Sequence, residues 1–185
     1  MQDYAKAREW YEKAATQGNA SAQHNLGIMY RDGIGVVQDN SEAREWFEKA
    51  ASQGLAESQA ALGNIYRDGI GVAKNYKKAF EWYEKAALQN DAFGQFGLGF
   101  LYDKGLGVKQ NYSKAFEWYK KAAEQGFMDA QYNLGVFYYN GQGVAQNYKQ
   151  ARKWIEKSAK QGHPKAKKAL KILSDQKNSR LLFYI

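Results

Sequence analysis

Several residue types are absent or rare in this chain of 185 residues. It has no cysteine, which excludes disulfides and thiolate metal sites and fits a cytoplasm or a disulfide-poor periplasm equally well. Its two histidines, His24 and His163, have no carboxylate or second histidine at ligand spacing. We therefore expect two surface histidines, no metal site and no catalytic triad. The single proline, Pro164, falls in the first turn of an expected helix, where proline is tolerated.

Long apolar runs are also missing. No window approaches the roughly eighteen continuous apolar residues of a membrane span, so none is expected. Met1 is followed by the polar segment QDYAKAREW, which is not a secretion signal. The first residues, MQDY, align with VQDN at 37–40, a repeat boundary. We therefore expect a piece of a longer protein, from which a signal could have been removed.

Acidic residues are scarce at one end of the chain. The net charge is +8, but residues 145–185 hold eleven Lys or Arg against Glu156 and Asp175, so the preceding part is close to neutral. This distribution does not predict a specific nucleic-acid site. We interpret the basic end as a solvated cap, because terminal repeats need a polar outer face. The alternative is a patch for a phosphate, an acidic protein or a lipid headgroup, formed by Lys165, Lys167, Lys168 and Lys171.

One seven-residue motif recurs along the chain with a fixed period. EWYEKAA stands at 9–15 and 81–87, EWFEKAA at 45–51, EWYKKAA at 117–123 and KWIEKSA at 153–159. The tryptophans are spaced by 36 residues, from Trp10 to Trp154, and a period of this length marks a helical repeat array. Thirty-six residues accommodate two short helices and two turns.

The first helix of each unit has a clear apolar stripe. In the first copy it contains Ala7, Trp10, Tyr11, Ala14 and Ala15, at the spacing of one helix face. Side chains that cap a helix N-terminus precede it, and Asp39 with Glu42 resembles a capping box. The expected N-caps are Asp3, Asp39, Asn75, Asn111 and Asn147. The expected left-handed C-terminal residues are Gly18, Gly54, Asn90, Gly126 and Gly162.

The second helix of each unit carries a glycine in its interior. Ala22, Leu26 and Tyr30 are expected on its buried side, with Gly27 beside Leu26. An interior glycine costs about 1 kcal/mol relative to alanine. Its recurrence therefore predicts a neighbouring backbone too close for a Cβ atom. The following segment, GIGVVQD in the first copy, should break the helix and place Val36 inward.

The pattern A-x-x-x-L-G-x-x-Y-x-x-G-x-G-V followed by KAxxWYxKAAxxG resembles the Sel1-like repeat, a relative of the tetratricopeptide repeat. The resemblance implies an all-α, right-handed solenoid of antiparallel helix pairs, with second helices at 20–31, 56–67, 92–103, 128–139 and 164–174 lining its concave side. It predicts one domain over 3–175, with units at 3–38, 39–74, 75–110, 111–146 and a capping unit at 147–175, and a tail at 176–185. Unlike some bacterial members, the chain has no cysteine pairs, and Lys171 replaces the expected glycine.

By this resemblance, one face of each second helix points into the groove. That face reads Ser21, His24, Ile28, Arg31 in the first unit and Glu57, Ala60, Asn64, Arg67 in the second. It turns aromatic with Phe93, Phe96, Phe100, Asp103 in the third and Asp129, Tyr132, Val136, Tyr139 in the fourth. Such rings either anchor a partner or fill a tight superhelix. The candidate partner-binding residues are Phe93, Phe96, Phe100, Tyr132, Val136, Tyr139, His24, Arg31, Asn64, Arg67 and Lys104.

Two further segments stand out. The third second-type helix contains Gly94, Gly97 and Gly99, which predicts the least stable part of the array. The apolar residues Leu181–Ile185 are expected to fold back, to associate with another copy, or to be foreign to the protein.

The sequence predicts a binding scaffold with no catalytic residue and no cofactor, holding a protein or peptide in its groove. One alternative is an inhibitor or immunity protein that covers a toxin. Another is a cell-wall or β-lactam hydrolase, for which Ser174 and Lys177 match S-x-x-K without the partner motifs. A third is binding of an anionic surface by the basic end.

Overall fold

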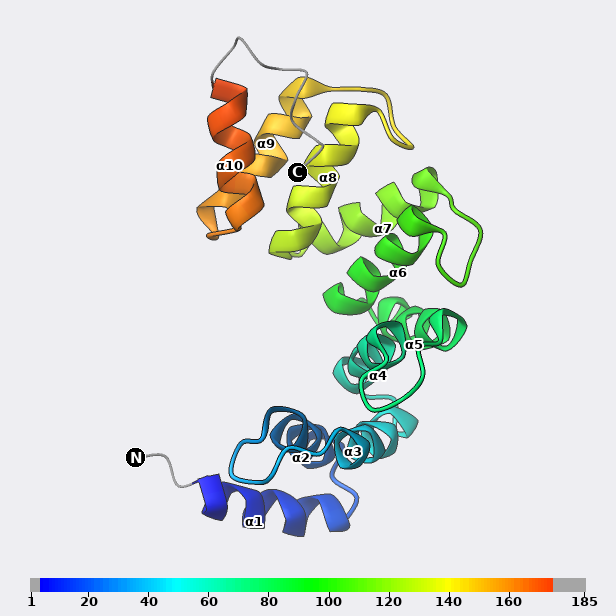
Figure 1. The fold of residues 1–185 in the computed structure, drawn as a ribbon, viewed down its shortest axis with the longest axis vertical. Helices are drawn as coiled ribbons and strands as arrows, with labels where there is room; N and C mark the ends of the chain where they lie inside the picture. Colours follow the sequence, from blue (N-terminus) through cyan, green and yellow to red (C-terminus); the bar gives the residue numbers. More distant parts are fainter. Residues whose placement is uncertain (1–3, 175–185) are drawn as a thin grey trace. The chain divides into compact units, whose positions relative to one another are not determined.

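Ten helices make up the described part of the chain, residues 4–174 of a computed structural model (Figure 1). They are α1 (Tyr4–Thr16), α2 (Ala20–Asp32), α3 (Asn40–Ser52), α4 (Ala56–Asp68), α5 (Tyr76–Leu88), α6 (Ala92–Lys104), α7 (Tyr112–Glu124), α8 (Met128–Asn140), α9 (Tyr148–Lys160) and α10 (Pro164–Ser174). The prediction of an all-helical repeat fold is confirmed. The expected tail at 176–185, with Lys177 and Leu181–Ile185, lies outside the described residues, as does Asp3.

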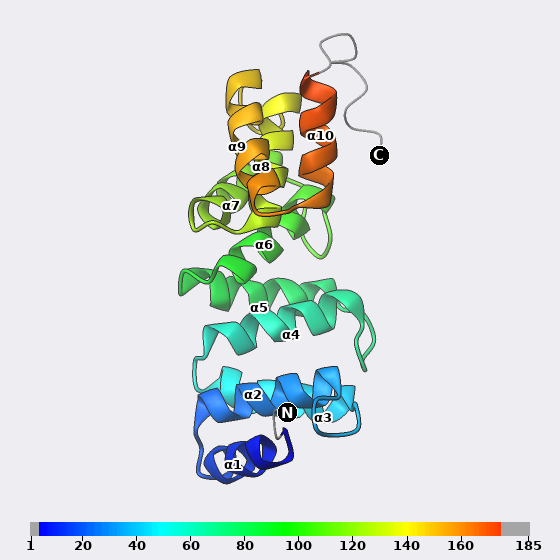
Figure 2. The same cartoon turned by 90° about the vertical axis from the view of Figure 1, so that its left-hand side faces the viewer.

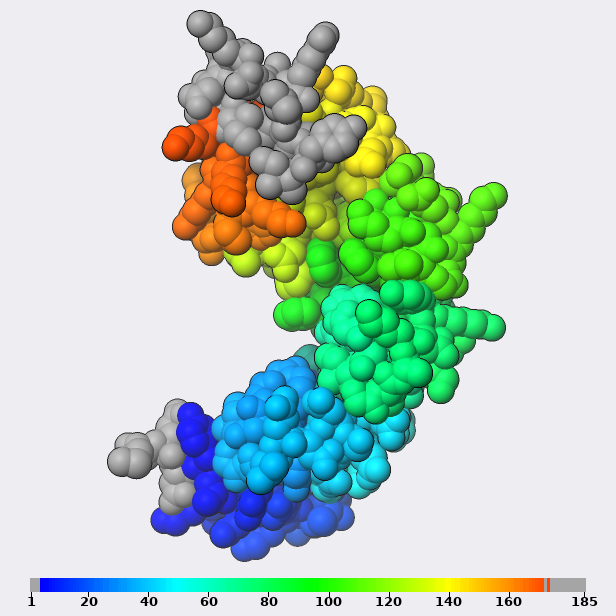
Figure 3. Space-filling view, in the orientation of Figure 1, coloured from blue at the N-terminus to red at the C-terminus, as the bar shows by residue number. Residues whose placement is uncertain are grey.

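The chain divides into two compact units, Met1–Gly97 and Leu98–Ile185, and the division falls inside α6. In the first unit, α1, α2 and α3 follow one another side by side in both ribbon views (Figures 1 and 2). The space-filling view shows these three helices as one continuous surface (Figure 3). In the second unit, α8 packs against both α7 and α9, and α9 packs against α10. Helices that are neighbours in sequence are therefore neighbours in space within each unit.

The helix ends follow the predicted signals. The side chains of Asp39, Asn75, Asn111 and Asn147 accept hydrogen bonds from first-turn amides at 2.8–3.0 Å. The expected C-terminal glycines and Asn90 have positive φ angles, from 65° to 102°. The capping box at Asp39 and Glu42 is incomplete, because the backbone N–H of Asp39 donates to the carbonyl of Tyr30 at 2.9 Å. The same bond recurs one repeat later and ties each loop to the helix before it, so Glu42 has no amide to accept from.

The recurring tryptophans lie at the edge of the apolar stripe rather than in the core. Trp10 is 69% exposed, and only Trp154 is buried, although the prediction placed this position with the buried residues. Each ring packs under the ammonium group of the lysine three residues later, as Lys49 does at 3.8 Å above the centre of Trp46. Each tryptophan ring therefore makes a cation–π contact with this lysine, which explains why W-x-x-K recurs in every first helix.

The interior glycines receive aromatic rings. A Cβ atom on Gly27 would lie 2.6 Å from the ring of Phe47, and one on Gly63 would overlap the ring of Tyr83. Both rings come from the first helix of the following repeat and are fully buried. The prediction of a close backbone is therefore wrong for these glycines, because the neighbour is a side chain. Gly135 faces the Ile155 side chain together with backbone atoms, since the carbonyl oxygen of Ala151 lies 3.0 Å from the built Cβ.

The second helices also bury glutamines that the hydrophobic pattern did not reveal. The Gln59 side chain donates to the carbonyl of Ala51 at 3.3 Å and accepts from the Gln89 side chain at 2.8 Å. Gln23 and Gln131 make the equivalent bonds. Each relay joins the ends of two consecutive first helices through one second helix. Elsewhere in α2 the prediction is correct for Ala22 and Leu26, whereas Met29 is buried in place of Tyr30, which is half-buried.

Candidate functional site

A pocket of about 220 Å³ lies on the second helices of the first unit. It is lined by His24, Ile28 and Arg31 of α2, by Glu57, Ala60, Ala61 and Asn64 of α4, and by Phe93 of α6. Four of these, His24, Arg31, Asn64 and Phe93, are candidate residues from the sequence, and Ala61 is an addition. The residues converge because positions 24, 28 and 31 share one helix face and recur one repeat later as 60, 64 and 67.

His24 forms a fixed, uncharged wall of this pocket. Its Nδ1 atom lies 2.8 Å from the hydroxyl of Ser58, and its ring is 5.4 Å from that of Phe47. Burial lowers the pKa of His24, which outweighs the opposite influence of the Glu57 carboxylate; Arg31 lowers it further. The imidazole is therefore neutral at pH 7. The predicted surface histidine is in fact half-buried.

The cations at the predicted rim are paired with their own neighbours. Arg31 makes a bidentate bond to Asp32, with both N–O distances at 2.7 Å, and Arg67 holds Asp68 in the same way. The guanidinium groups lower the pKa of each aspartate. Lys104 likewise lies 3.0 Å from a carboxylate oxygen of Asp103. These pairs neutralise the charges that the sequence assigned to orienting a ligand, so the exposed carboxylate of Glu57 is the stronger polar feature.

The three phenylalanines of α6 differ in exposure. Phe93 is 56% exposed and reaches the pocket, whereas Phe96 and Phe100 are half-buried. Phe93 and Phe96 belong to the first unit and Phe100 to the second. Phe93 is therefore the ring of this group with the most surface for an incoming side chain.

The second unit has its own pocket, of about 270 Å³. Its lining residues are Asp103, Lys104, Tyr132, Asn133, Val136, Phe137, Asn140 and Gln142. Three predicted residues, Lys104, Tyr132 and Val136, lie here. The prediction of an accessible Tyr139 is wrong: this side chain is only 8% exposed and packs edge-on against Tyr148 at 5.1 Å. Burial of the Tyr139 ring against α9 removes apolar surface from water, which stabilises this orientation. The arginines at the same repeat position, Arg31 and Arg67, keep their charged groups at the surface.

His163 was predicted at the surface and is buried instead, with 7% of its surface exposed. Its Nδ1 atom accepts the backbone N–H of Ala166 at 3.0 Å, which caps α10. Its Nε2 atom lies 3.1 Å from Asp129, and its ring stacks on Tyr132 at 4.7 Å. The capping signal could have revealed this role, because Asn19 caps α2 from the same repeat position.

We expect the stability of the chain to decrease as the pH is lowered from about 7.5 to about 5.5. Burial lowers the pKa of His163 below its ordinary value of 6.5, although Asp129 opposes this. The unfolded chain then binds the proton first, so stability present above pH 6.5 is lost on acidification. His163→Asn, which keeps a cap like that of Asn19, should reduce this loss in thermal melts by circular dichroism.

A matched variant measures the contribution of the second histidine, His24, to the pH dependence of stability. His24→Ala introduces the residue found at the equivalent position 60, and it should remove the remaining part of the pH dependence. Melting temperatures that do not change over this pH range in the unmodified chain would contradict the assignment.

The lysines of the basic end, Lys165, Lys167, Lys168 and Lys171, are all exposed on α10, opposite the buried Ala166 and Ala169. Among residues 4–174, no group of three or more potential ligand side chains is arranged to hold a metal ion. None of the helices in the same range is long and apolar enough to cross a membrane.

Helices that alternate with a 36-residue spacing and pack in sequence order define a helical-repeat solenoid. The chain belongs to the Sel1 repeat family, whose model matches residues 1–19, 20–55, 56–91, 92–127 and 129–163. No curated protein sequence matches it.

Solved structures give three informative similarities. A protective antigen of uropathogenic Escherichia coli strains with an SLR fold is 41% identical to this chain, with a TM-score of 0.83. The match covers 95% of this chain but only 38% of the antigen. A Sel1 repeat protein from Oxalobacter formigenes is 37% identical, with a TM-score of 0.88 over 96% of this chain and 70% of that one. An immunity protein from Pseudomonas aeruginosa is 26% identical, with a TM-score of 0.61 over 90% of this chain and 61% of its own.

Proposed function

We propose that the chain is a non-catalytic interaction module that binds a segment of a partner protein in the pocket of α2, α4 and Phe93. The observation that carries the proposal is the large exposed fraction of Phe93, 56%, beside the small side chains of Ala60 and Ala61. Exposed aromatic rings next to a recess are typical anchors of protein interfaces. Sel1 repeat proteins commonly bind proteins, which supports the same assignment.

The size and charge of the pocket indicate the kind of segment. A volume of about 220 Å³ is below the range of about 300–1,000 Å³ for sites that enclose a small molecule, so it suits one large side chain. Ile28, Ala60 and Phe93 favour an apolar anchor. Glu57 is exposed at the same pocket, whereas Arg31 is paired with Asp32. The preferred ligand is therefore an apolar residue followed or preceded by a lysine or arginine.

A displayed peptide library tests this directly. Peptides selected on the unmodified chain should contain an apolar–basic pair, and Phe93→Ala should weaken the best of them about tenfold or more. Leu88→Ala is the matched control, because Leu88 is an exposed apolar residue of α5 that does not line the pocket. Glu57→Lys should select against the basic residue. Equal binding by the Phe93 and Leu88 variants, each checked for helicity, would contradict the proposal.

A second candidate is an immunity-type inhibitor, favoured by the structural likeness to the Pseudomonas immunity protein. Such a protein would form a rigid one-to-one complex over a standard interface of about 1,600 Å², far larger than one pocket. In that case Phe93→Ala would change affinity little, since its contribution is one among many. Protection of an extended surface in hydrogen exchange, rather than of α2 and α4 alone, would identify this function.

A further inference from the structure

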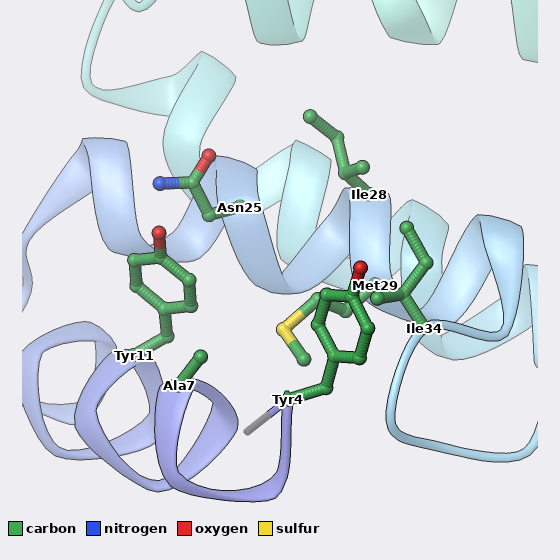
Figure 4. Close-up of a pocket in the computed structure, with 7 residues that line it drawn as sticks. All are labelled: Tyr4, Ala7, Tyr11, Asn25, Ile28, Met29 and Ile34. Atoms are coloured by element: carbon green, nitrogen blue, oxygen red, sulfur yellow. The ribbon is translucent and has the colours of Figure 1, made fainter. Parts of the chain in front are cut away.

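Three pockets of the chain differ in the charge of their walls. The pocket of about 390 Å³ between α1 and α2 has no charged side chain among its lining residues, which Figure 4 labels as Tyr4, Ala7, Tyr11, Asn25, Ile28, Met29 and Ile34. The pocket beside Phe93 has one cationic and one anionic residue, Arg31 and Glu57. The pocket of about 270 Å³ in the second unit is the most polar of the three, because an ion pair and three side-chain amides line it. Its chemistry is therefore the most specific guide to a ligand.

The ion pair of this polar pocket has the reverse order of the pairs in the first unit. Arg31 and Arg67 each come before the aspartate that they bind. Asp103 stands at the same repeat position but comes before its partner, Lys104. The Asp103 side chain is only 12% exposed, whereas that of Lys104 is 55% exposed. The reversal therefore places a carboxylate at the position that holds a guanidinium in the earlier repeats, and it leaves the cation toward solvent.

The Asp103 carboxylate acts on the buried end of the pocket. Burial raises the pKa of the Tyr119 hydroxyl, and the Asp103 carboxylate raises it further. Tyr119 is fully buried and packs edge-on against Phe137 of the pocket wall, with 5.3 Å between the ring centres. A carboxylate in such surroundings repels a second anion and attracts a cation. Lys104 meets this demand only in part, since an ion pair with an exposed partner contributes little.

The other polar lining residues match a planar guanidinium rather than a compact ammonium group. The Asn140 side chain donates to the side-chain oxygen of Gln142 at 3.4 Å, so its own oxygen is left as an acceptor. The Tyr132 ring stacks on His163 with 4.7 Å between the ring centres, and it also lines the pocket. A guanidinium stacks on aromatic rings and donates five N–H bonds in one plane. An arginine side chain can therefore use the carboxylate, the amide oxygens and the ring together.

We propose that this pocket binds the side chain of an arginine in a partner protein. The guanidinium pairs with the Asp103 carboxylate in place of Lys104 and lies against the Tyr132 ring. Val136 and Phe137 provide apolar surface for the methylene groups of the same side chain. The volume of about 270 Å³ is below the range of about 300–1,000 Å³ for sites that enclose a small molecule, so it suits one long side chain. The proposal concerns the second unit alone and does not rest on the function proposed for the first.

Blocked arginine, acetylated at its amino group and amidated at its carboxyl group, is the probe, and the whole chain labelled with nitrogen-15 is the receptor. The probe should shift the backbone amide signal of Asp103 and the side-chain amide signals of Asn133 and Gln142. Blocked citrulline, which has nearly the same shape without the charge, should bind about tenfold more weakly. Blocked lysine should also bind more weakly, because an ammonium group cannot donate two parallel hydrogen bonds to a carboxylate.

Substitutions in the chain separate the carboxylate from general effects of charge. Asp103→Asn keeps the shape and should weaken binding about tenfold, and Asp103→Arg, the residue of the first two repeats, should abolish it. Lys104→Gln should strengthen binding severalfold, because it removes the internal competitor for the carboxylate. Glu117→Gln is the matched control, since Glu117 is exposed on α7 and does not line the pocket. The same loss of one negative charge should have no effect there.

The absence of saturable shifts with blocked arginine, or equal binding of blocked citrulline, would overturn the proposal. Equal effects of Asp103→Asn and Glu117→Gln would do the same. Tighter binding of free arginine than of the blocked form would overturn it in favour of a free amino acid as the occupant. Phe93→Ala should leave arginine binding unchanged, so a failure here is distinct from a failure of the function proposed for the first unit.

Discussion

Tyr83→Ala should lower the free energy of unfolding by about 3–5 kcal/mol, as expected for a large aromatic residue removed from a core. The Tyr83 ring is fully buried and lies between Gly63 of the preceding repeat and Gly97 of its own. Neither glycine has a side chain that could move into the space, so the cavity persists. At about 2–4 °C per kcal/mol for a chain of this size, the melting temperature should fall by about 10 °C.

Tyr83→Phe is the matched control, because phenylalanine occupies the same repeat position at Phe47. It removes only the hydroxyl that donates to Asn64 at 2.7 Å, a bond worth about 1 kcal/mol. Burial raises the pKa of Tyr83, so the hydroxyl stays protonated and the comparison holds across the neutral range. Urea unfolding followed by circular dichroism measures both variants. Equal losses for alanine and phenylalanine would show that the ring does not fill the interface.

Gly63→Leu should destabilise the chain by about 3 kcal/mol, near the upper end for overpacked cores. A leucine is a better helix former than glycine by nearly 1 kcal/mol, so a prediction from propensity alone has the opposite sign. The ring of Tyr83 already occupies the site of the first added carbon. The two helices must therefore separate or the ring must leave its position.

A double-mutant cycle isolates that contact. Gly63→Leu should cost much less in a Tyr83→Ala background, because the new side chain enters the cavity left by the ring. Lys171→Leu tests the same helix position in α10, where the lysine is exposed, and it should change stability by no more than about 0.5 kcal/mol. Additive effects of Gly63→Leu and Tyr83→Ala would contradict the ring-over-glycine contact.

The candidate site was predictable where helix geometry, combined with the groove-facing side that the Sel1-like resemblance implies, places residues. Positions 24, 28 and 31 lie on one face, and the 36-residue period brings positions 57, 60 and 64 of the next helix beside them. His24, Asn64 and Phe93 accordingly line one pocket. The role of these residues in binding a partner remains a prediction, which the Phe93 variant tests.

Side-chain direction at the helix ends was not predictable. Tyr139 and Arg31 share a repeat position, yet the ring of Tyr139 turns into the core whereas Arg31 pairs with Asp32. His163 caps its own helix through Ala166, but its contact with Asp129 joins two segments that are distant in sequence. Both outcomes depend on the chemistry of the neighbouring helix, which the sequence of one element does not contain.

The sequence by itself determined the helix pairs, their caps and the family, because periodicity and turn residues act within a few positions of the chain. It also identified the glycines as contact points. Only the tertiary structure decided what touches them, namely the rings of Phe47, Tyr83 and Tyr119 from the following repeat. The physical reason is that burial of a ring depends on whether a second helix arrives to cover it. Tyr11 and Tyr83 have the same local sequence, and one is partly exposed whereas the other is fully buried.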